Sequence, residues 1–200
     1  MKKGFTLLEL LIVIGILAIL STTMIIVINP AQMLKKARDS QRISDLNSLK
    51  TAIAFYITET SAPSIGTVYT AKTYSDVNAV LCGAAGVATS TTQVTNGTGW
   101  IPINFDGMTG GSPIGSLPTD PNKTLINANP GRYYVYLVGS ATNYTFKLAA
   151  NLESTYYSTS GGGDVETGDG GTETTLYEVG TSLTTPIATG TATCYTGTGV

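Results

Sequence analysis

The sequence predicts an α+β fold in which one long N-terminal helix packs against a small antiparallel sheet that carries long loops. Three observations predict it. An almost unbroken apolar run extends from Leu10 to Ile28, an amphipathic stretch follows from Ala31 to about Thr60, and strand-like alternation appears within residues 132–150. Together these patterns divide the 200 residues into a helical stem and a head.

The apolar run is long enough to cross a membrane. A helix over Phe5–Ile28 would be ~36 Å long at ~1.5 Å per residue, against a hydrocarbon core of ~30 Å. The preceding segment Met1–Gly4 carries two lysines, as the cytoplasmic end of a membrane segment tends to do. An ordinary signal peptide is cut after its apolar run at an A-x-A-like site, and no such site occurs near Ser21–Asn29.

Two residues distinguish this segment from a plain membrane anchor. Gly4 is a small residue that precedes the apolar run, so cleavage after it would leave the helix on the mature chain. Glu9 places a carboxylate inside the apolar segment. An ionisable side chain in that setting costs a few kcal/mol and marks a candidate functional residue.

The stretch KKGFTLLELLIVI at residues 2–14 resembles the class III leader of type IV pilins and type II secretion pseudopilins. In that family a prepilin peptidase cuts after the glycine and methylates the new N-terminus. The resemblance implies cleavage between Gly4 and Phe5, N-methylation of Phe5, and a role for Glu9 in assembly. A buried carboxylate needs a partner, and the Phe5 amine of a neighbouring subunit would supply one.

The resemblance also implies a function and a domain plan. The chain would be a subunit of a type IV pilus-like extracellular filament with a lollipop fold. It would hold a leader at 1–4, a membrane-spanning and filament-core helix at 5–28, an amphipathic helix at 29–60 and a head at 61–200. Within the head, 61–131 would connect the helix to a β-hairpin at 132–150, and 151–200 would form a Gly/Thr-rich C-terminal region.

The implied partners and location follow from the same resemblance. The chain would polymerise with itself and would meet the prepilin peptidase, an assembly ATPase and a platform membrane protein. It would sit once across the cytoplasmic membrane and then join a filament at the cell surface. Two alternatives stay open: a type II secretion pseudopilin, or a membrane-anchored adhesin that never polymerises.

Pro30 interrupts the helical pattern after Asn29. It would either kink one long helix or begin a second one, with Asn29 as N-cap and Gln32 completing a capping box. We expect a continuous helix in the isolated subunit. In a filament we expect local loss of helix between about Gly15 and Pro30.

The amphipathic stretch presents two faces. The apolar face should pack on the sheet and consists of Ile43, Leu46, Leu49, Ile53, Tyr56 and Ile57. The opposite face carries Lys35, Lys36, Arg38, Asp39, Arg42 and Asp45. These charges are either simply solvated, or the basic residues among them meet acidic surfaces or lipid headgroups of neighbouring subunits during assembly.

In the head, the strongest strand signal is Arg132–Val138. After a short loop, Tyr144–Ala150 is predicted to pair with it as the second strand of a hairpin. Leu176–Val179 is a candidate further strand. The turn Pro118-Thr119-Asp120-Pro121 resembles that of G-type major pseudopilins and related small pilins. Trp100 is expected to anchor the core beneath the long connection.

The two cysteines, Cys82 and Cys194, permit one intramolecular disulfide. An exported head lies in an oxidising compartment, which favours that bond. Closing so long a loop would contribute ~4–5 kcal/mol in the chain-entropy model and would tie down the C-terminal region.

The Gly-rich stretch at 161–171 carries Asp164, Glu166 and Asp169. It lacks the lysine of a P-loop and the spacing of an EF-hand. G-type pseudopilins bind calcium in a comparable acidic loop, so the resemblance implies these three residues as candidate calcium ligands, although the spacing here differs. Calcium is the only cofactor that the sequence suggests.

Composition argues against enzymes and nucleic-acid binders. The chain has no histidine, which removes the usual triads and the commonest zinc ligand. From residue 61 onward four basic residues face nine acidic ones, so no broad surface for nucleic acid is expected.

Overall fold

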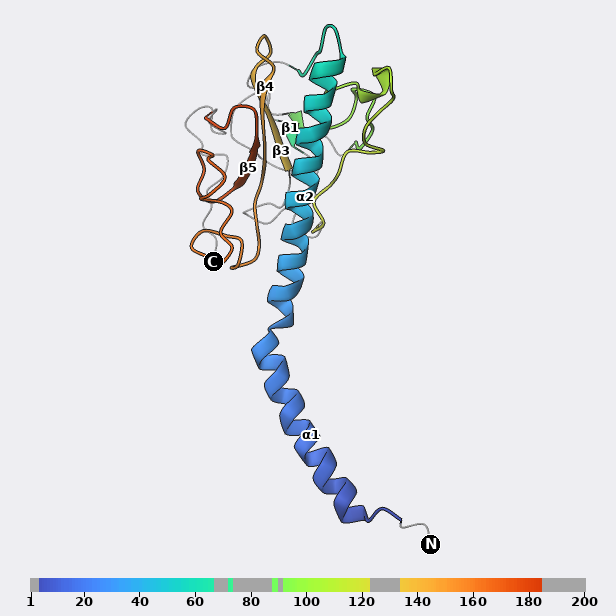
Figure 1. The fold of residues 1–200 in the computed structure, drawn as a ribbon, viewed down its shortest axis with the longest axis vertical. Helices are drawn as coiled ribbons and strands as arrows, with labels where there is room; N and C mark the ends of the chain where they lie inside the picture. The colour runs from blue at the N-terminus through green and yellow to red at the C-terminus, as the bar shows by residue number, and fades with distance from the viewer. Residues whose placement is uncertain (1–3, 67–71, 74–87, 90–91, 123–133, 185–200) are drawn as a thin grey trace.

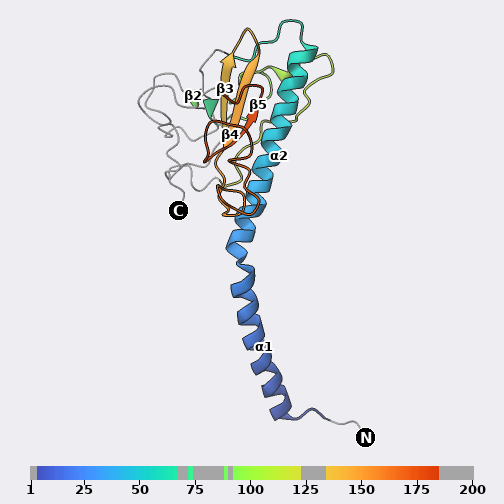
Figure 2. The same ribbon diagram turned by 60° about the vertical axis from the view of Figure 1, so that its left-hand side comes forward.

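The computed structural model describes residues 4–66, 72–73, 88–89, 92–122 and 134–184 and shows a helical stem with a head along its upper part (Figure 1). The stem comprises α1 (Leu7–Ile28) and α2 (Pro30–Glu59). Figure 2 shows the sheet on one side of α2, with α1 extending below and away from the head. The predicted α+β class, a long apolar N-terminal helix joined to a small sheet with long loops, is confirmed.

The stem is not one continuous helix, so our expectation for the isolated subunit was wrong. Asn29 separates the two helices in the left-handed conformation, with φ 44° and ψ 75°. Its N–H donates to the carbonyl of Ile25, and its side chain accepts a hydrogen bond from the N–H of Gln32 at 3.3 Å. Pro30 takes the first helical position, where its missing N–H costs nothing. The capped break avoids a proline inside a helix.

The sheet has five strands among the described residues, in the order β2-β1-β3-β4-β5. The short strands β1 (Lys72–Thr73) and β2 (Ala88–Thr89) pair in parallel. The longer strands β3 (Tyr134–Ser140), β4 (Thr145–Ala150) and β5 (Tyr177–Gly180) form an antiparallel meander. The hairpin of β3 and β4 and the added strand β5 were predicted. Strands β1 and β2 were not, because two residues are too few to show a periodicity.

The core lies between α2 and the sheet. Leu46, Leu49 and Ile53 are fully buried on α2, as the apolar stripe predicted. The facing side chains of β3 and β4 are Tyr134, Tyr136, Val138, Phe146, Leu148 and Ala150. Trp100 is also fully buried, and the short 3-10 helix Phe105–Gly107 follows it, so the long connection covers one edge of the core.

Arg42 is fully buried and binds three carboxylates from separate parts of the chain. Its Nε and Nη2 each donate to Asp120 at 2.7 Å. Its Nη1 lies 2.7 Å from both Asp39 Oδ1 and Glu153 Oε1. Asp39 in turn accepts hydrogen bonds from the backbone N–H groups of Glu153 and Ser154. One guanidinium therefore joins α2, the turn at Asp120 and the chain that leaves β4.

This cluster overturns the expectation that Asp39 and Arg42 lie on a solvated or lipid-facing surface of α2. Both side chains are fully buried. Positions 39 and 42 continue the three-to-four-residue spacing of the stripe below Leu46, so the helix must bury them. A buried arginine is tolerated only when carboxylates pair with it, and the turn that carries Asp120 brings one.

Asp45, on the face expected to be solvated, also has a partner. The hydroxyl of Tyr134 donates to its Oδ2 at 2.7 Å. Burial raises the pKa of Asp45, and this hydrogen bond only partly offsets the rise. The contact ties a second turn of α2 to β3.

A second buried ion pair lies on the other face of the sheet. Lys147 Nζ on β4 lies 2.8 Å from Glu178 Oε1 on β5, and neither side chain is more than 1% exposed. The alternation in β4 predicted one apolar and one polar face. The structure buries both faces, and the polar face is satisfied by pairing across adjacent strands rather than by water.

Replacing Arg42 by Met is expected to lower the free energy of unfolding by about 3–5 kcal/mol, because three buried carboxylates lose their shared cation. The measurement is urea unfolding of the full chain in detergent micelles, followed by fluorescence of Trp100, the single tryptophan. Lys50→Met is the control, because Lys50 is exposed on the same helix. Equal losses in both variants would show that the cluster adds nothing to stability.

The stability of the head is expected to fall in acid through Glu153. Burial raises the pKa of this residue, but hydrogen bonds from Arg38 and Arg42 outweigh it and lower the pKa to about 2. Because folding favours the ionised form, the contribution is complete above pH ~4.5 and disappears as the pH falls towards 2.

A comparison with Glu153→Gln isolates this contribution from the other carboxylates. The difference in unfolding free energy between the native chain and the variant should be constant near neutral pH and should shrink between pH ~4.5 and 2. A difference that does not change over this range would contradict the assigned role of Glu153.

Candidate functional site

The segment from Gly4 to Glu9 lies at the free end of the stem, far from the head (Figure 1). Gly4, Phe5 and Thr6 are exposed and not helical, and α1 begins at Leu7. A Cβ placed on Gly4 would meet no atom within 4 Å. Nothing in the described fold therefore requires glycine at this position.

Thr6 and Glu9 together begin the helix. Thr6 is the N-cap, and its hydroxyl oxygen accepts a hydrogen bond from the N–H of Glu9 at 3.2 Å. The same hydroxyl lies 3.4 Å from Glu9 Oε2. Glu9 is exposed, and it forms no ion pair with any residue that the structure describes. Its carboxylate is favourably placed at the positive end of the helix and remains available to a further cation.

The surface of α1 is apolar on every side. The stretch Leu7–Ile25 is long and apolar enough to span a membrane, and none of it is buried within the chain. A helix that is apolar all round must be covered by lipid or by other protein. The only ionisable side chain on this surface is Glu9.

The three candidate calcium ligands lie on the turns that follow β4. Asp164 accepts hydrogen bonds from the backbone N–H groups of Ser160, Glu166 and Thr167 at 2.8, 3.0 and 3.1 Å. The backbone and hydroxyl hydrogen bonds from Thr167 lower the pKa of Asp164. This carboxylate therefore organises its own turn.

Glu166 and Asp169 make similar local contacts. Glu166 is buried and accepts hydrogen bonds from the backbone N–H and the hydroxyl of Thr159. Asp169 accepts from the N–H groups of Gly171 at 2.7 Å and Glu178 at 2.6 Å. Burial raises the pKa of both carboxyl groups.

These contacts do not form a calcium site as they stand. Within the described part of the chain, no three acidic, histidine or cysteine side chains form a group that would hold a metal ion. The carboxylate oxygens that calcium would need accept hydrogen bonds from amides and hydroxyls of the loop instead. Calcium binding by Asp164, Glu166 and Asp169 stays a prediction.

Cys82 and Cys194, the predicted disulfide partners, both lie outside the described residues. The disulfide stays a prediction.

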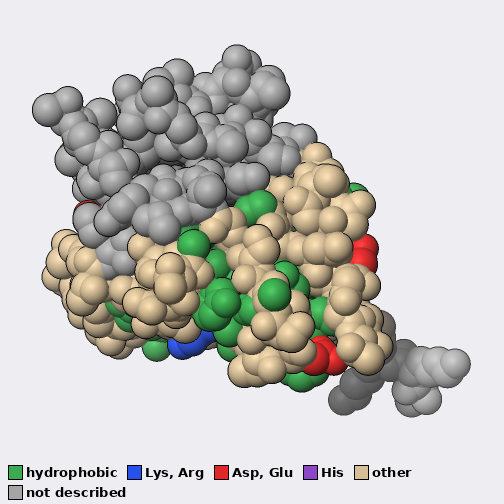
Figure 3. Space-filling model, turned by 90° about the horizontal axis from the view of Figure 1, so that it is seen from above, with side chains coloured by type: hydrophobic (Ala, Val, Ile, Leu, Met, Phe, Trp, Pro, Cys, Tyr) green, Lys and Arg blue, Asp and Glu red, His purple; other side chains and the backbone are tan. Residues whose placement is uncertain are grey.

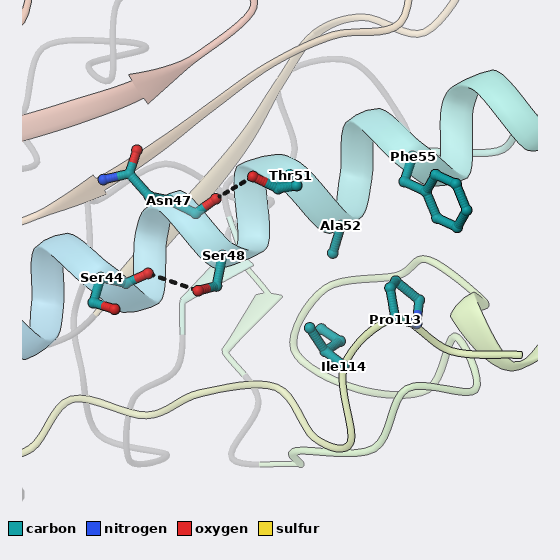
Figure 4. A pocket seen from close by; sticks show the side chains of 8 residues that line it. All are labelled: Ser44, Asn47, Ser48, Thr51, Ala52, Phe55, Pro113 and Ile114. Atoms are coloured by element: carbon teal, nitrogen blue, oxygen red, sulfur yellow. Dashed lines mark hydrogen bonds between the residues drawn. The ribbon is translucent and has the colours of Figure 1, made fainter.

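An open groove of about 580 Å³ lies between the outer face of α2 and the connection that follows the 3-10 helix (Figure 4). The side chains around it are small, hydroxylic, amide or apolar, and none is ionisable. The hydroxyl of Ser48 donates to the carbonyl of Ser44, and that of Thr51 donates to the carbonyl of Asn47. These hydroxyls are engaged by the helix backbone, so the groove offers no nucleophile paired with a base.

Comparison with known proteins places the recognisable family signal in the first part of the chain. Residues 1–25 match the family model of the prokaryotic N-terminal methylation motif. No curated protein and no solved structure matches the chain. The matched residues contain Gly4, Phe5, Glu9 and most of α1. The chain therefore carries a class III prepilin-type leader, the leader of the type IV pilin-like and pseudopilin substrates of prepilin peptidase.

Proposed function

We propose that this chain is a structural subunit of a type IV pilus-like extracellular filament. The observation that supports this most strongly is the combination of the methylation motif with an unburied α1 that is apolar on all sides. Prepilin peptidase cuts between Gly4 and Phe5 and methylates the Phe5 amine. Before assembly α1 lies in the cytoplasmic membrane, and after assembly the same surface packs against α1 of other subunits.

The proposal gives Gly4 a role that the fold does not. Since a side chain at this position would meet nothing in the described structure, the requirement for glycine comes from the peptidase. Residues 4–6 are exposed and lie outside the helix, so the scissile bond is open to the enzyme. The residues removed are the short basic end, and α1 stays on the mature chain.

Glu9 then acts in polymerisation. Cleavage creates a cationic amine at Phe5, about one helical turn from Glu9 along the chain. When α1 leaves the lipid, Glu9 of one subunit pairs with the Phe5 amine of the next, because an unpaired charge in an apolar filament core is costly. This pairing sets the axial register. An assembly ATPase and a platform protein in the membrane drive the growth.

A type II secretion pseudopilus is the second candidate, and the turn at Asp120 favours it. Pro118-Thr119-Asp120-Pro121 resembles the turn of G-type pseudopilins, and here Asp120 is bound to Arg42. Electron microscopy of cells separates the two candidates. Long surface fibres that contain this chain favour the pilus, and short fibres confined to the secretion apparatus favour the pseudopilus.

Gly4→Val is expected to block processing, because the side chain obstructs the peptidase but not the fold. Intact-mass spectrometry of the chain from cells with an active prepilin peptidase should show loss of Met1–Gly4 and one added methyl group on Phe5, and the variant should keep its leader. The control is Gly15→Val, since Gly15 is equally unhindered but lies within α1. A native chain that begins at any other residue would refute the proposal.

Glu9→Gln is expected to leave cleavage intact and to reduce incorporation into filaments by about ten- to a hundredfold, the effect of losing one charged pairing of about 1.5–3 kcal/mol. Sheared filaments are quantified against the membrane pool by immunoblotting. The matched control is Glu59→Gln, which makes the same chemical change at an exposed glutamate, the last residue of α2. Normal incorporation of Glu9→Gln would exclude the pairing.

A further inference from the structure

The lower end of the head carries basic and tyrosine side chains where the stem leaves it. We name this the basal surface and define it as Lys35, Lys36, Tyr156 and Tyr157. We propose that the basal surface binds the phosphate headgroups of anionic phospholipids in the outer leaflet of the bilayer that α1 spans. The inference rests on the membrane stage of the proposed function.

The position of the basal surface along the stem matches the depth of the headgroups. Exposed apolar side chains continue beyond the break at Asn29, because Met33 is 58% exposed and Leu34 is 63% exposed. Lys35 follows immediately and lies seven residues, ~10 Å, beyond the end of α1. Helical side chains lean towards the N-terminus, here towards the bilayer. The headgroup layer extends ~5–8 Å beyond the hydrocarbon, so a lysine ammonium reaches it.

The charged groups of the basal surface are the partly exposed ammonium groups of Lys35 and Lys36, while the neighbouring carboxylates are engaged. Lys35 forms no hydrogen bond or ion pair with any described residue, and the partners of Lys36 among these residues are the rings of Tyr156 and Tyr157. Asp39 and Glu153 have almost no exposed side-chain area and are bound by Arg42 and backbone amides. The ion-pair cluster beside these lysines has a net charge of −1. It contains two arginines, Arg38 and Arg42, and three acids, Asp39, Asp120 and Glu153.

Adding Lys35 and Lys36 changes the net charge of this region to +1, and the added positive charges lie at the surface. The next carboxylate along the chain after Glu153 is that of Asp164, whose oxygens accept hydrogen bonds from its own turn. A phosphate at the basal surface therefore finds two ammonium groups that pair with no described carboxylate, whereas the oxygens of Asp39, Glu153 and Asp164 already accept hydrogen bonds.

The tyrosines hold Lys36 in place and suit a membrane interface. Lys36 Nζ lies 3.3 Å from the ring centroid of Tyr156, and that ring meets Tyr157 edge to face at 4.9 Å. The hydroxyl of Tyr157 lies 3.1 Å from Ser40 Oγ on α2. Tyr156 remains 42% exposed. Tyrosine is enriched at membrane interfaces because its ring prefers an apolar setting and its hydroxyl prefers water.

The opposite end of the head differs from the basal surface. Seen from above, the described atoms are mostly uncharged, with only scattered acidic and basic side chains (Figure 3). Charge complementarity therefore selects an anionic lipid surface as the occupant of the basal surface.

The test uses the full-length, uncut chain in lipid nanodiscs, where α1 holds it in every lipid composition. One set contains phosphatidylcholine alone, and the other contains increasing fractions of phosphatidylglycerol. A nitroxide on the lipid headgroup broadens the NMR signals of nearby backbone amides. We expect stronger broadening of Lys35, Lys36 and Tyr156 as phosphatidylglycerol increases, and reversal at high salt.

Lys35→Gln should raise the fraction of phosphatidylglycerol at half-maximal broadening about fivefold, and adding Lys36→Gln should raise it about fivefold again. Lys50→Gln is the matched control, because Lys50 is exposed on α2 but lies far above the membrane. Fluorescence of Trp100 confirms that each variant keeps its fold.

Equal broadening in both lipids, or a double variant that behaves as the native chain, would overturn the inference. If Lys35 and Lys36 became inaccessible to solvent only in assembled filaments, the inference would also be overturned, because their partner would then be a second subunit. A chain that fails to insert into nanodiscs would instead refute the membrane stage of the proposed function.

Discussion

The buried guanidinium of Arg42 is the interaction on which the arrangement of the head depends. It links α2 to Asp120 in the long connection and to Glu153 after β4, so three segments that are distant in sequence share one cation. The sheet packs against α2 through apolar side chains, which tolerate sliding. Directional hydrogen bonds of 2.7 Å do not, and they fix where the head lies along the stem. The loop that carries the tyrosines of the basal surface begins at this cluster.

The fold could be predicted from the sequence wherever neighbours in sequence determine it. The apolar run of α1 and the alternating strands β3 and β4 show their periodicity within a few residues. The Arg42 cluster could not be predicted, because Arg42 and Asp120 lie 78 positions apart and no local pattern connects them. The break at Asn29 was misjudged for a different reason. The sequence offered two ways to satisfy the backbone around Pro30, and only the conformation of Asn29 decides between them.

The candidate site shows the same division. Gly4, Phe5 and Glu9 lie within six residues of one another inside the matched motif, so the sequence alone was enough to propose them as a site. The candidate calcium ligands depended on loop geometry that the sequence does not show, and the carboxylate of Asp164 accepts hydrogen bonds from its own turn. The basal surface depends on two segments that meet only in the folded chain, since Tyr156 reaches Lys36 across more than one hundred positions. Its lysines were visible in the sequence, but their aromatic partner was not.

The uniform apolarity of α1 has a geometric consequence. An amphipathic helix has a preferred orientation about its long axis, because rotating it exposes its apolar face to water. α1 has no such preference, since its described side chains are all exposed and, apart from Glu9 and the hydroxyl residues at 21–23, are apolar. In the filament that we propose, hydrophobicity would therefore hold α1 in the core but would not determine the direction in which the head faces. The rotational orientation of the subunit would have to come from polar contacts at the two ends of the stem, those of Glu9 at one end and those of the head at the other.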